Sequence, residues 1–334
     1  MWGRPWQPPP LAPVAAPPES PWAGGPRAAV PAPVAARASS LVRAASLTHF
    51  AEVARQCGLN PDRLLLDAGL DPGVLREPDL MVSAERVQDV LETAAERARD
   101  PAFGLRMAVT RQLSNLGPVG LLVRDQPTAR ESIQVLVRHH ATLNGALAMG
   151  LEEQGELVLV REELLPARAA QPTRQAIELA VGVLFALLRR LLGPGWRPQR
   201  VCFVHAAPRD PGAHQQILGA PVDFGAEFNG IVCLARELNG RNPDADPQMA
   251  RYAQRLFEAG PGGLDGSIVD QVRRMIALLL PSGRCSIEQV AGHLGLVPRT
   301  VQRRLAEQGH SFSELVNDLR VELAQRHVAA GERP

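Results

Sequence analysis

Lysine is missing from this chain of 334 residues, so all 36 basic residues are arginine. A GC-rich coding bias, which also favours alanine, proline and glycine, explains this better than a functional demand does. Aromatic residues are sparse at 4%, and acidic and basic residues balance to a net charge of +1. A nucleic-acid surface must therefore come from local clustering of arginine rather than from a basic chain as a whole.

The cysteines are few and scattered, at Cys57, Cys202, Cys233 and Cys285. They form no CxxC pair and have no histidine at zinc-ligand spacing, which argues against a structural metal site and a disulfide framework. The most apolar run, residues 177–188, is too short for the roughly 20 residues that span a membrane. We therefore expect a cytoplasmic protein with reduced thiols, no metal and no membrane partner.

Recognisable catalytic motifs are also missing. The chain contains no GxSxG, no HExxH, no Walker sequence and no GxGxxG. The only glycine-rich candidate near the centre, "GPGWRP", has the composition of a turn. The sequence therefore predicts a protein that is not an enzyme and needs no cofactor.

Composition divides the chain into four parts. Residues 1–40 are rich in proline and alanine and predict a disordered leader, because such a segment buries too little surface to offset its ordering entropy. Residues 41–258 have the mixed pattern of a globular domain. Residues 259–266, "AGPGGLDG", have the composition of a linker, and residues 267–334 have helical periodicity throughout.

Within residues 41–258, helical signals come first and strand signals follow. Asn60, Ser83 and Thr128 each stand before a helical pattern as N-cap candidates. Alternating apolar residues on both sides of "EEQG" predict a hairpin, a long helix follows, and further strands are predicted at 200–205, near Val222 and Phe224, and at 230–234. The expected architecture is an α/β or α+β domain followed by an all-α module.

The segment "SIEQVAGHLGLVPRTVQRRLAEQGHSF", which begins at Ser286, predicts a helix-turn-helix. Val290, Leu294, Val301 and Leu305 form the inward stripes of two short helices, and small Ala291 allows their close approach. Gly295 is expected to adopt the left-handed backbone of the turn, Leu296 to fill the junction, and Pro298 to open the second helix.

The outward face of the second helix carries the predicted DNA contacts. Arg299, Gln302 and Arg303 recur on the side opposite the inward stripe, where arginine and glutamine can bind guanine and adenine edges in the major groove. Thr300 belongs to the same helix, and Arg304 lies to the side, better placed for phosphate. The competing interpretation is an ordinary solvated helical hairpin, but the small residue, the glycine and the basic face all fall in register.

These residues carry a family resemblance. "SIEQVAGHLGLVPRTVQRRLAEQGHSFSELVNDLRVELAQRHV" resembles the first half of the DNA-binding region of AraC/XylS-type transcription regulators. Upstream, "SNLGPVGLLVRDQPTARES" and "FVHAAPRDPGAHQQILGAPVDFGAEFNGIVCL" resemble the effector-sensing domain of one branch of that family. The resemblance implies an effector-sensing and dimerising domain over residues 41–258, a partial DNA-binding domain over residues 267–334, and a small molecule and double-stranded DNA as partners.

The chain departs from the family pattern in two places. Val297 stands where the family has a serine, and the loss of that cap costs the helix about 1 kcal/mol. The family carries a second helix-turn-helix, whereas this sequence ends at Pro334. We therefore expect a chain truncated after its first helix-turn-helix, either as a real truncation or as a frameshift or gene-calling artefact. Because a site bound near 10 nM requires about 11 kcal/mol, we expect DNA binding that is weak or requires a homodimer.

The alternative that the sequence leaves open is an effector-binding, dimerising module that no longer binds DNA and acts through mixed dimers. For the effector, the candidate contacts are His140, Trp196 and His205. Each has an ordinary explanation as well: His140 as a core histidine on an apolar helix face, Trp196 as cover for the core beneath a turn, and His205 as a strand-end residue that bonds a loop.

Overall fold

The computed structural model describes residues 40–165, 173–243, 245–259, 267–280, 285–294 and 296–329. The predicted disordered leader, apart from Ser40, and the predicted linker, apart from Ala259, lie outside the described residues. The same holds for Gly295, so the left-handed turn predicted there is not tested.

The first part of the described chain is a helical layer closed by a short two-stranded sheet, β1 (Leu41–Arg43) paired antiparallel with β2 (Met81–Ser83). The predicted caps are present: Asn60 accepts a hydrogen bond from the Arg63 amide and Ser83 from the Arg86 amide. Apolar side chains from these helices form one core around the fully buried Phe50 and Phe103. The layer comprises η1 (Ala44–Leu47), α1 (Phe50–Gln56), α2 (Pro61–Asp67), η2 (Pro72–Arg76), α3 (Ala84–Ala98) and α4 (Phe103–Ala108).

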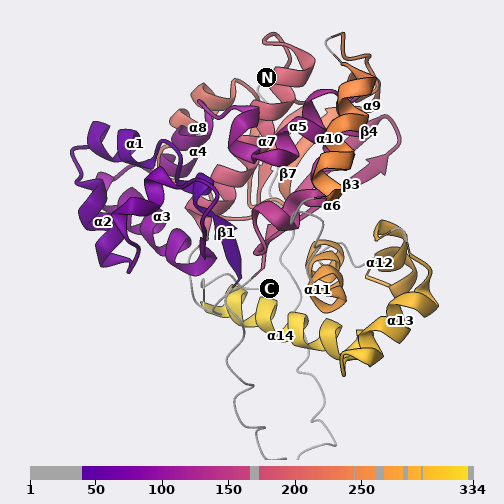
Figure 1. The fold of residues 1–334 in the computed structure, drawn as a ribbon. Helices are drawn as coiled ribbons and strands as arrows, with labels where there is room; N and C mark the ends of the chain where they lie inside the picture. The colour runs from indigo at the N-terminus through magenta and orange to yellow at the C-terminus, as the bar shows by residue number, and fades with distance from the viewer. Residues whose placement is uncertain are drawn as a thin grey trace, which may run out of the picture. The chain divides into compact units, whose positions relative to one another are not determined.

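A five-stranded mixed sheet forms the centre of the next part, in the order β3-β4-β7-β5-β6. Its strands β3, β4 and β7 are labelled in Figure 1. The first two strands are the predicted hairpin, and only the pair β5–β6 is parallel. Together with the surrounding helices, this sheet confirms the predicted mixture of helices and strands. The strands are β3 (Leu147–Gln154), β4 (Leu157–Leu164), β5 (Arg200–Phe203), β6 (Val222–Phe224) and β7 (Asn229–Leu234).

Seven helical segments accompany the sheet, and the long α7 contributes most to its core. The apolar run in α7 is buried against both the sheet and α4, as expected of a core helix. Among the described residues, no helix is long and apolar enough to cross a membrane. These segments are η3 (Leu113–Leu116), α5 (Pro118–Arg124), α6 (Ala129–Leu143), α7 (Arg174–Leu192), α8 (Gly212–Leu218), α9 (Ala235–Leu238) and α10 (Pro247–Ala259).

The described residues of the last part form helices without a strand, as predicted, and have a core of their own. Helix α11 (Ile268–Leu279) packs against the three helices that follow it. These are α12 (Ile287–His293), α13 (Pro298–Glu307) and α14 (Phe312–Ala329), drawn from orange to yellow in Figure 1.

Strand β3 faces the sheet core on one side and α11 on the other. Leu147 and Met149 belong to the core of the sheet, whereas Ala148 belongs to the core of the C-terminal helices. Gly150 lies against Leu278 so closely that an added Cβ would overlap the leucine methyl Cδ2. The two-residue period of a strand thus separates two contacts that lie only one residue apart in sequence.

Candidate functional site

The predicted helix-turn-helix forms from two separate helices with a shared interior. Val290, Ala291, Val301 and Leu305 are fully buried, and α12 packs directly against α13. Ser286 caps α12 by accepting a hydrogen bond from the Gln289 amide at 3.3 Å. The inward stripes and the small residue at the crossing therefore lie where the sequence pattern predicted.

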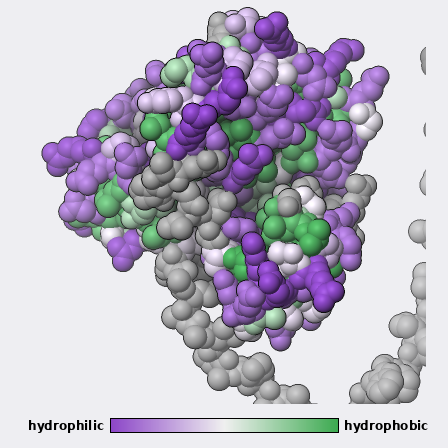
Figure 2. All heavy atoms as spheres, turned by 45° about the vertical axis from the view of Figure 1, so that its right-hand side comes forward, coloured by the Kyte–Doolittle hydropathy of each residue, from purple (hydrophilic) through white to green (hydrophobic). Residues whose placement is uncertain are grey.

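The opposite face of α13 is exposed and basic. Arg299, Gln302, Arg303 and Arg304 are exposed, while Thr300 is half-buried in the first turn. Arg303 has a loose partner in Glu307, with 3.8 Å between Nε and Oε1. In Figure 2, hydrophilic side chains predominate at the lower edge of the molecule, and a hydrophobic patch lies directly above them. An exposed basic face such as that of α13 can contact DNA, and its role in DNA binding stays a prediction.

Helix α13 begins without a side-chain cap. Val297, the N-cap residue, is 63% exposed and makes no capping hydrogen bond, because a valine side chain has no acceptor atom. Pro298 occupies the first helical position, and Gly309, with φ of 77°, follows the end of the helix. The helix is therefore supported mainly by its buried stripe rather than by its ends.

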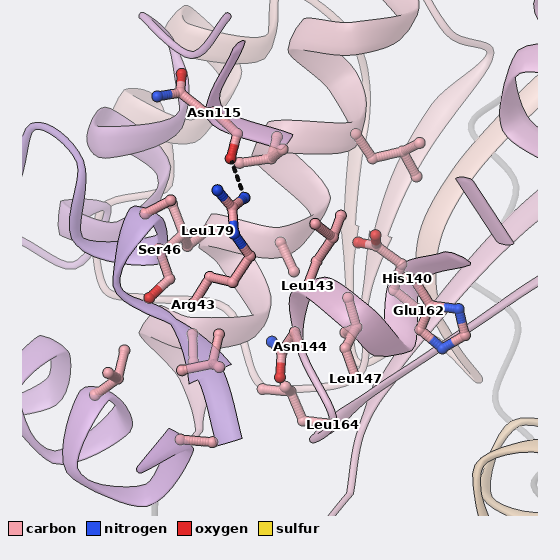
Figure 3. A pocket seen from close by; sticks show the side chains of 18 of the residues that line it. Arg43, Ser46, Asn115, His140, Leu143, Asn144, Leu147, Glu162, Leu164 and Leu179 are labelled. Carbon is pink, nitrogen blue, oxygen red and sulfur yellow. Dashed lines mark hydrogen bonds between the residues drawn. The ribbon is translucent and has the colours of Figure 1, made fainter. Parts of the chain in front are cut away.

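A cavity lies between the helical layer and the hairpin β3–β4 and has a volume of about 140 Å³. Its wall is mostly apolar and is drawn from the helical layer, α6, α7 and both hairpin strands. Figure 3 shows His140 and Glu162 at one side and Arg43, Ser46 and Asn115 at the other. The main apolar lining residues are Leu91, Leu136, Leu147, Met149, Leu164 and Leu179.

Glu162 is the unusual residue of this cavity. It is 3% exposed, and its Oε2 has no hydrogen-bond partner among the described residues. Burial raises the pKa of Glu162 to about 8, so that the carboxyl is mostly protonated at neutral pH. An unpartnered buried carboxyl is costly, which makes it a candidate binding group.

The two arginines in the wall are already engaged by the fold. Arg43 pairs with Asp79 and donates to the Asn115 carbonyl at 3.0 Å. Arg111 donates to the carbonyls of Ala45 and Ser46, and burial lowers the pKa of Arg111 to about 10. Arg111 therefore remains charged at neutral pH. Both guanidinium groups have acceptors, although Arg111 Nε has no partner among the described residues.

His140, the first of the predicted effector contacts, does line the cavity. Its Nδ1 lies 2.7 Å from the Val137 carbonyl oxygen, which accepts the hydrogen bond if that nitrogen carries the proton. Burial lowers the pKa of His140 to about 4, against a smaller opposing effect of this bond. The imidazole is therefore neutral and supplies no positive charge to Glu162.

Trp196 and His205 do not line this cavity. Trp196 is buried beside Phe185 with 6.3 Å between ring centroids, and its Nε1 donates to Glu237 Oε2 at 3.0 Å. It fills the core at the end of α7, and its predicted effector contact finds no support in the lining of the cavity.

His205 instead belongs to a buried polar cluster around Glu178. The Nε2 atoms of His205 and His214 lie 3.2 Å and 3.0 Å from Glu178 Oε1. Burial raises the pKa of Glu178, but the interactions with the two histidines outweigh burial and leave that pKa below its usual value. Within the described ranges, no group of three or more histidine, cysteine or acidic side chains is arranged to hold a metal ion.

Comparison with known proteins shows the family of this chain. Residues 58–242 match the family described as the arabinose-binding domain of AraC transcription regulators, N-terminal. The HTH-type transcriptional regulator VirS of Mycobacterium tuberculosis is 30% identical over 293 residues, which cover 87% of this chain and 86% of VirS. The chain belongs to the AraC family of transcription regulators.

Two further proteins are similar to this AraC-family chain. The ornithine utilization regulator of Pseudomonas aeruginosa is 22% identical over 299 residues, which cover 89% of this chain and 87% of that protein. The crystal structure of the transcriptional regulator CdpR from the same species matches with a TM-score of 0.45 and 19% identity, covering 81% of this chain and 89% of that chain.

Family membership supports a DNA-binding transcription regulator with an effector domain. The predicted truncation after the first helix-turn-helix stays a prediction. Sequence reasoning missed Glu162, although a signal was present: in "LVLVREEL" every second residue from Val158 onward points to the core, and Glu162 occupies one of those positions.

Proposed function

We propose that α13 is the recognition helix of this regulator and that the cavity beside Glu162 is its effector site. The recognition-helix assignment rests on one observation: the arginine face of α13 is exposed, while its opposite face is a fully buried stripe. We assign base contacts to Arg299, Gln302 and Arg303, and phosphate contacts to Thr300 and Arg304. The corresponding domains are residues 41–258 for sensing and residues 267–334 for DNA binding.

The size and wall of the cavity support an effector of small volume. Its 140 Å³ is close to the roughly 150 Å³ of an engineered apolar cavity that binds benzene. A few polar groups in a mostly apolar wall are typical of small-molecule sites. One relative is named for the utilization of ornithine, which supports a small-molecule effector for this chain as well.

Strand β3 is the proposed link between effector and DNA. Leu147 and Met149 line the cavity, while Ala148 and Gly150 contact α11 from the other side of the same strand. An effector that shifts β3 changes the surface on which α11 rests, and α11 in turn packs against α12 and α13. Binding can then alter the population of DNA-competent arrangements, provided that the effector prefers one of them.

A homodimer is proposed from an apolar stripe on the outside of α10. Met249, Tyr252 and Leu256 recur at helical spacing and are each more than two-fifths exposed. Exposed Leu121 belongs to α5, the helix against which α10 packs. Since a transcription regulator must reach DNA, we also propose a cytoplasmic location. We further propose that the chain has no catalytic activity.

The test is selection of duplexes from a random DNA pool by the full chain, followed by fluorescence anisotropy on an enriched sequence. We expect enrichment of a defined sequence and a logarithm of affinity that falls linearly with the logarithm of salt concentration, because arginines displace counterions from phosphate. Sedimentation of the free chain measures the dimer. Absence of any enriched sequence would contradict the assignment of α13.

A further inference from the structure

The position of Glu162 in the sheet is one that normally takes an apolar side chain. Val158, Val160 and Leu164 point to the same side of β4 and are buried in the sheet core. Glu162 pairs in register with Met149 on β3 and with Asn229 on β7, so it lies in the interior of the sheet rather than at an edge. A carboxyl here has no access to bulk water to offset its burial.

Among the described residues, no cation pairs with Glu162. Arg161, its chain neighbour, points to the other face, where it pairs with Glu152 at 3.1 Å and lies over the Phe228 ring. The guanidinium groups of Arg43 and Arg111 have acceptors of their own, as described above. His140 is neutral, and the nearby positive charge of Arg274 on α11 helps to keep it so.

Among the described atoms of the wall, unmet acceptors outnumber unmet donors: Glu162 Oε2, Gln88 Oε1 and His140 Nε2 lack a partner, Arg111 Nε is an unmet donor, and Ser46 Oγ can serve as either. A ligand that supplies hydrogen-bond donors and a positive charge would satisfy these acceptors. A carboxylate ligand could accept from Arg111 Nε, but it would leave the unmet acceptors unpaired.

We propose that the effector is a small organic amine whose ammonium group binds Glu162 while its apolar body fills the space lined by Leu147, Leu164 and Leu179. This inference rests on the proposed function, since it names the ligand class of the same cavity. The carboxyl ionises when the ammonium binds, and its proton leaves to solvent. No other covalent change is involved.

Proton release gives the proposal a signature that a structural role of Glu162 does not produce. The carboxyl is mostly protonated below a pH of about 8, so the affinity for an ammonium ligand rises with pH up to that value, by at most roughly tenfold per unit. The other charged or titratable groups that face this space are Arg43, Arg111 and His140. The pKa of Arg111 is about 10 and that of His140 is about 4, so neither changes protonation between pH 6 and 8.

The experiment is isothermal titration calorimetry of the full chain with benzylamine, benzyl alcohol and benzoate, three probes of similar shape and different charge. Each titration is repeated at pH 6 and pH 8, and in two buffers of different ionisation enthalpy. We expect benzylamine to bind most tightly, to bind more tightly at pH 8, and to release a proton at pH 6. The variant Glu162→Gln is expected to lose roughly 30-fold or more in benzylamine affinity.

Glu163→Gln is the matched control, because Glu163 is the next residue on the same strand and accepts from Asn229 Nδ2 on the sheet. It should bind benzylamine like the original chain. Benzoate binding best, equal loss in both variants, or benzylamine binding without proton release would each overturn the proposal. So would failure of all three probes to bind a chain that still selects DNA, and that result would leave the regulator assignment intact.

Discussion

The exposed face of α13 and the cavity beside Glu162 use charged side chains in opposite ways. On α13 the guanidinium groups are exposed, so that a partner of opposite charge can reach them. In the cavity the carboxyl is enclosed and gives up its charge unless a ligand restores it. Charge on a surface therefore costs little stability and binds broadly, whereas charge in an interior costs stability and can select one ligand.

The strongest test of this comparison removes charge from the exposed side. Arg299→Ala combined with Arg303→Ala should weaken binding to a selected duplex by about 2–6 kcal/mol, because each bidentate base contact contributes roughly 1–3 kcal/mol. The salt dependence should also become shallower. Fluorescence anisotropy measures both quantities, and Arg55→Ala on the exposed part of α1 is the control. Unchanged affinity in the double variant would remove α13 from the interface.

A second test compares two buried acids through the same substitution. Glu178→Gln should lower the free energy of unfolding by about 3 kcal/mol, because hydrogen bonds to a charged group contribute most when both partners are buried. Since the folded-state pKa of Glu178 is depressed, the loss should be full above the ordinary value of 4.5 and should disappear as pH falls through the folded pKa. Urea titrations at pH 7 and at a series of pH values below 4.5 measure it.

The effect of Glu162→Gln on the free energy of unfolding should have the opposite sign to that of Glu178→Gln. The pKa of Glu162 is raised from 4.5 to about 8, so the folded original chain loses stability as pH rises between these values. The variant should gain about 2 kcal/mol at pH 8 and little at pH 5, within the limit of about 1.4 kcal/mol per pH unit. Comparing both chains at each pH cancels the contribution of His140. A gain that does not depend on pH would contradict the raised pKa.

The connection between the two regions can be broken at β3. Gly150→Val should push Leu278 away and lower the free energy of unfolding by about 1–2 kcal/mol, as overpacked contacts do. Ligand binding in the cavity should persist, while its effect on DNA affinity is lost. Calorimetry and anisotropy on the same sample separate these outcomes. Gly195→Val, where an added side chain meets open space, is the control.

The smallest expected effect concerns the start of α13. Val297→Ser supplies the missing cap and should raise the free energy of unfolding by about 0.5–1 kcal/mol. Thermal unfolding followed by circular dichroism measures the shift. Val297→Ala, which removes exposed apolar surface without adding a cap, should not reproduce it.

Local features of this chain were predictable and features assembled from a distance were not. The helix-turn-helix depends on residues within a few turns of one another, so Ala291, Val301 and the exposed arginines could be placed from spacing alone. The cavity joins β1, α6, α7 and the hairpin, and which side chains meet there follows from tertiary packing. Of the three predicted effector contacts, only His140 lines the cavity.

The hairpin itself was predicted, but the burial of the charged residue Glu162 within it was not. Strand alternation places Glu162 inward, yet a run such as "REE" suggests a solvated strand end unless the neighbouring strands are known. The parallel pairing of β6 with β5 and the short β1–β2 sheet likewise depend on partners far along the chain. Such contacts are long-range, and single-sequence periodicity carries little information about them.

The pleat of β3 has an evolutionary consequence. Odd-numbered positions of the strand can mutate toward a new ligand while even-numbered positions keep their hold on α11, since neighbouring side chains leave the backbone in opposite directions. A lineage carrying this strand could diversify what it detects and preserve how detection is transmitted.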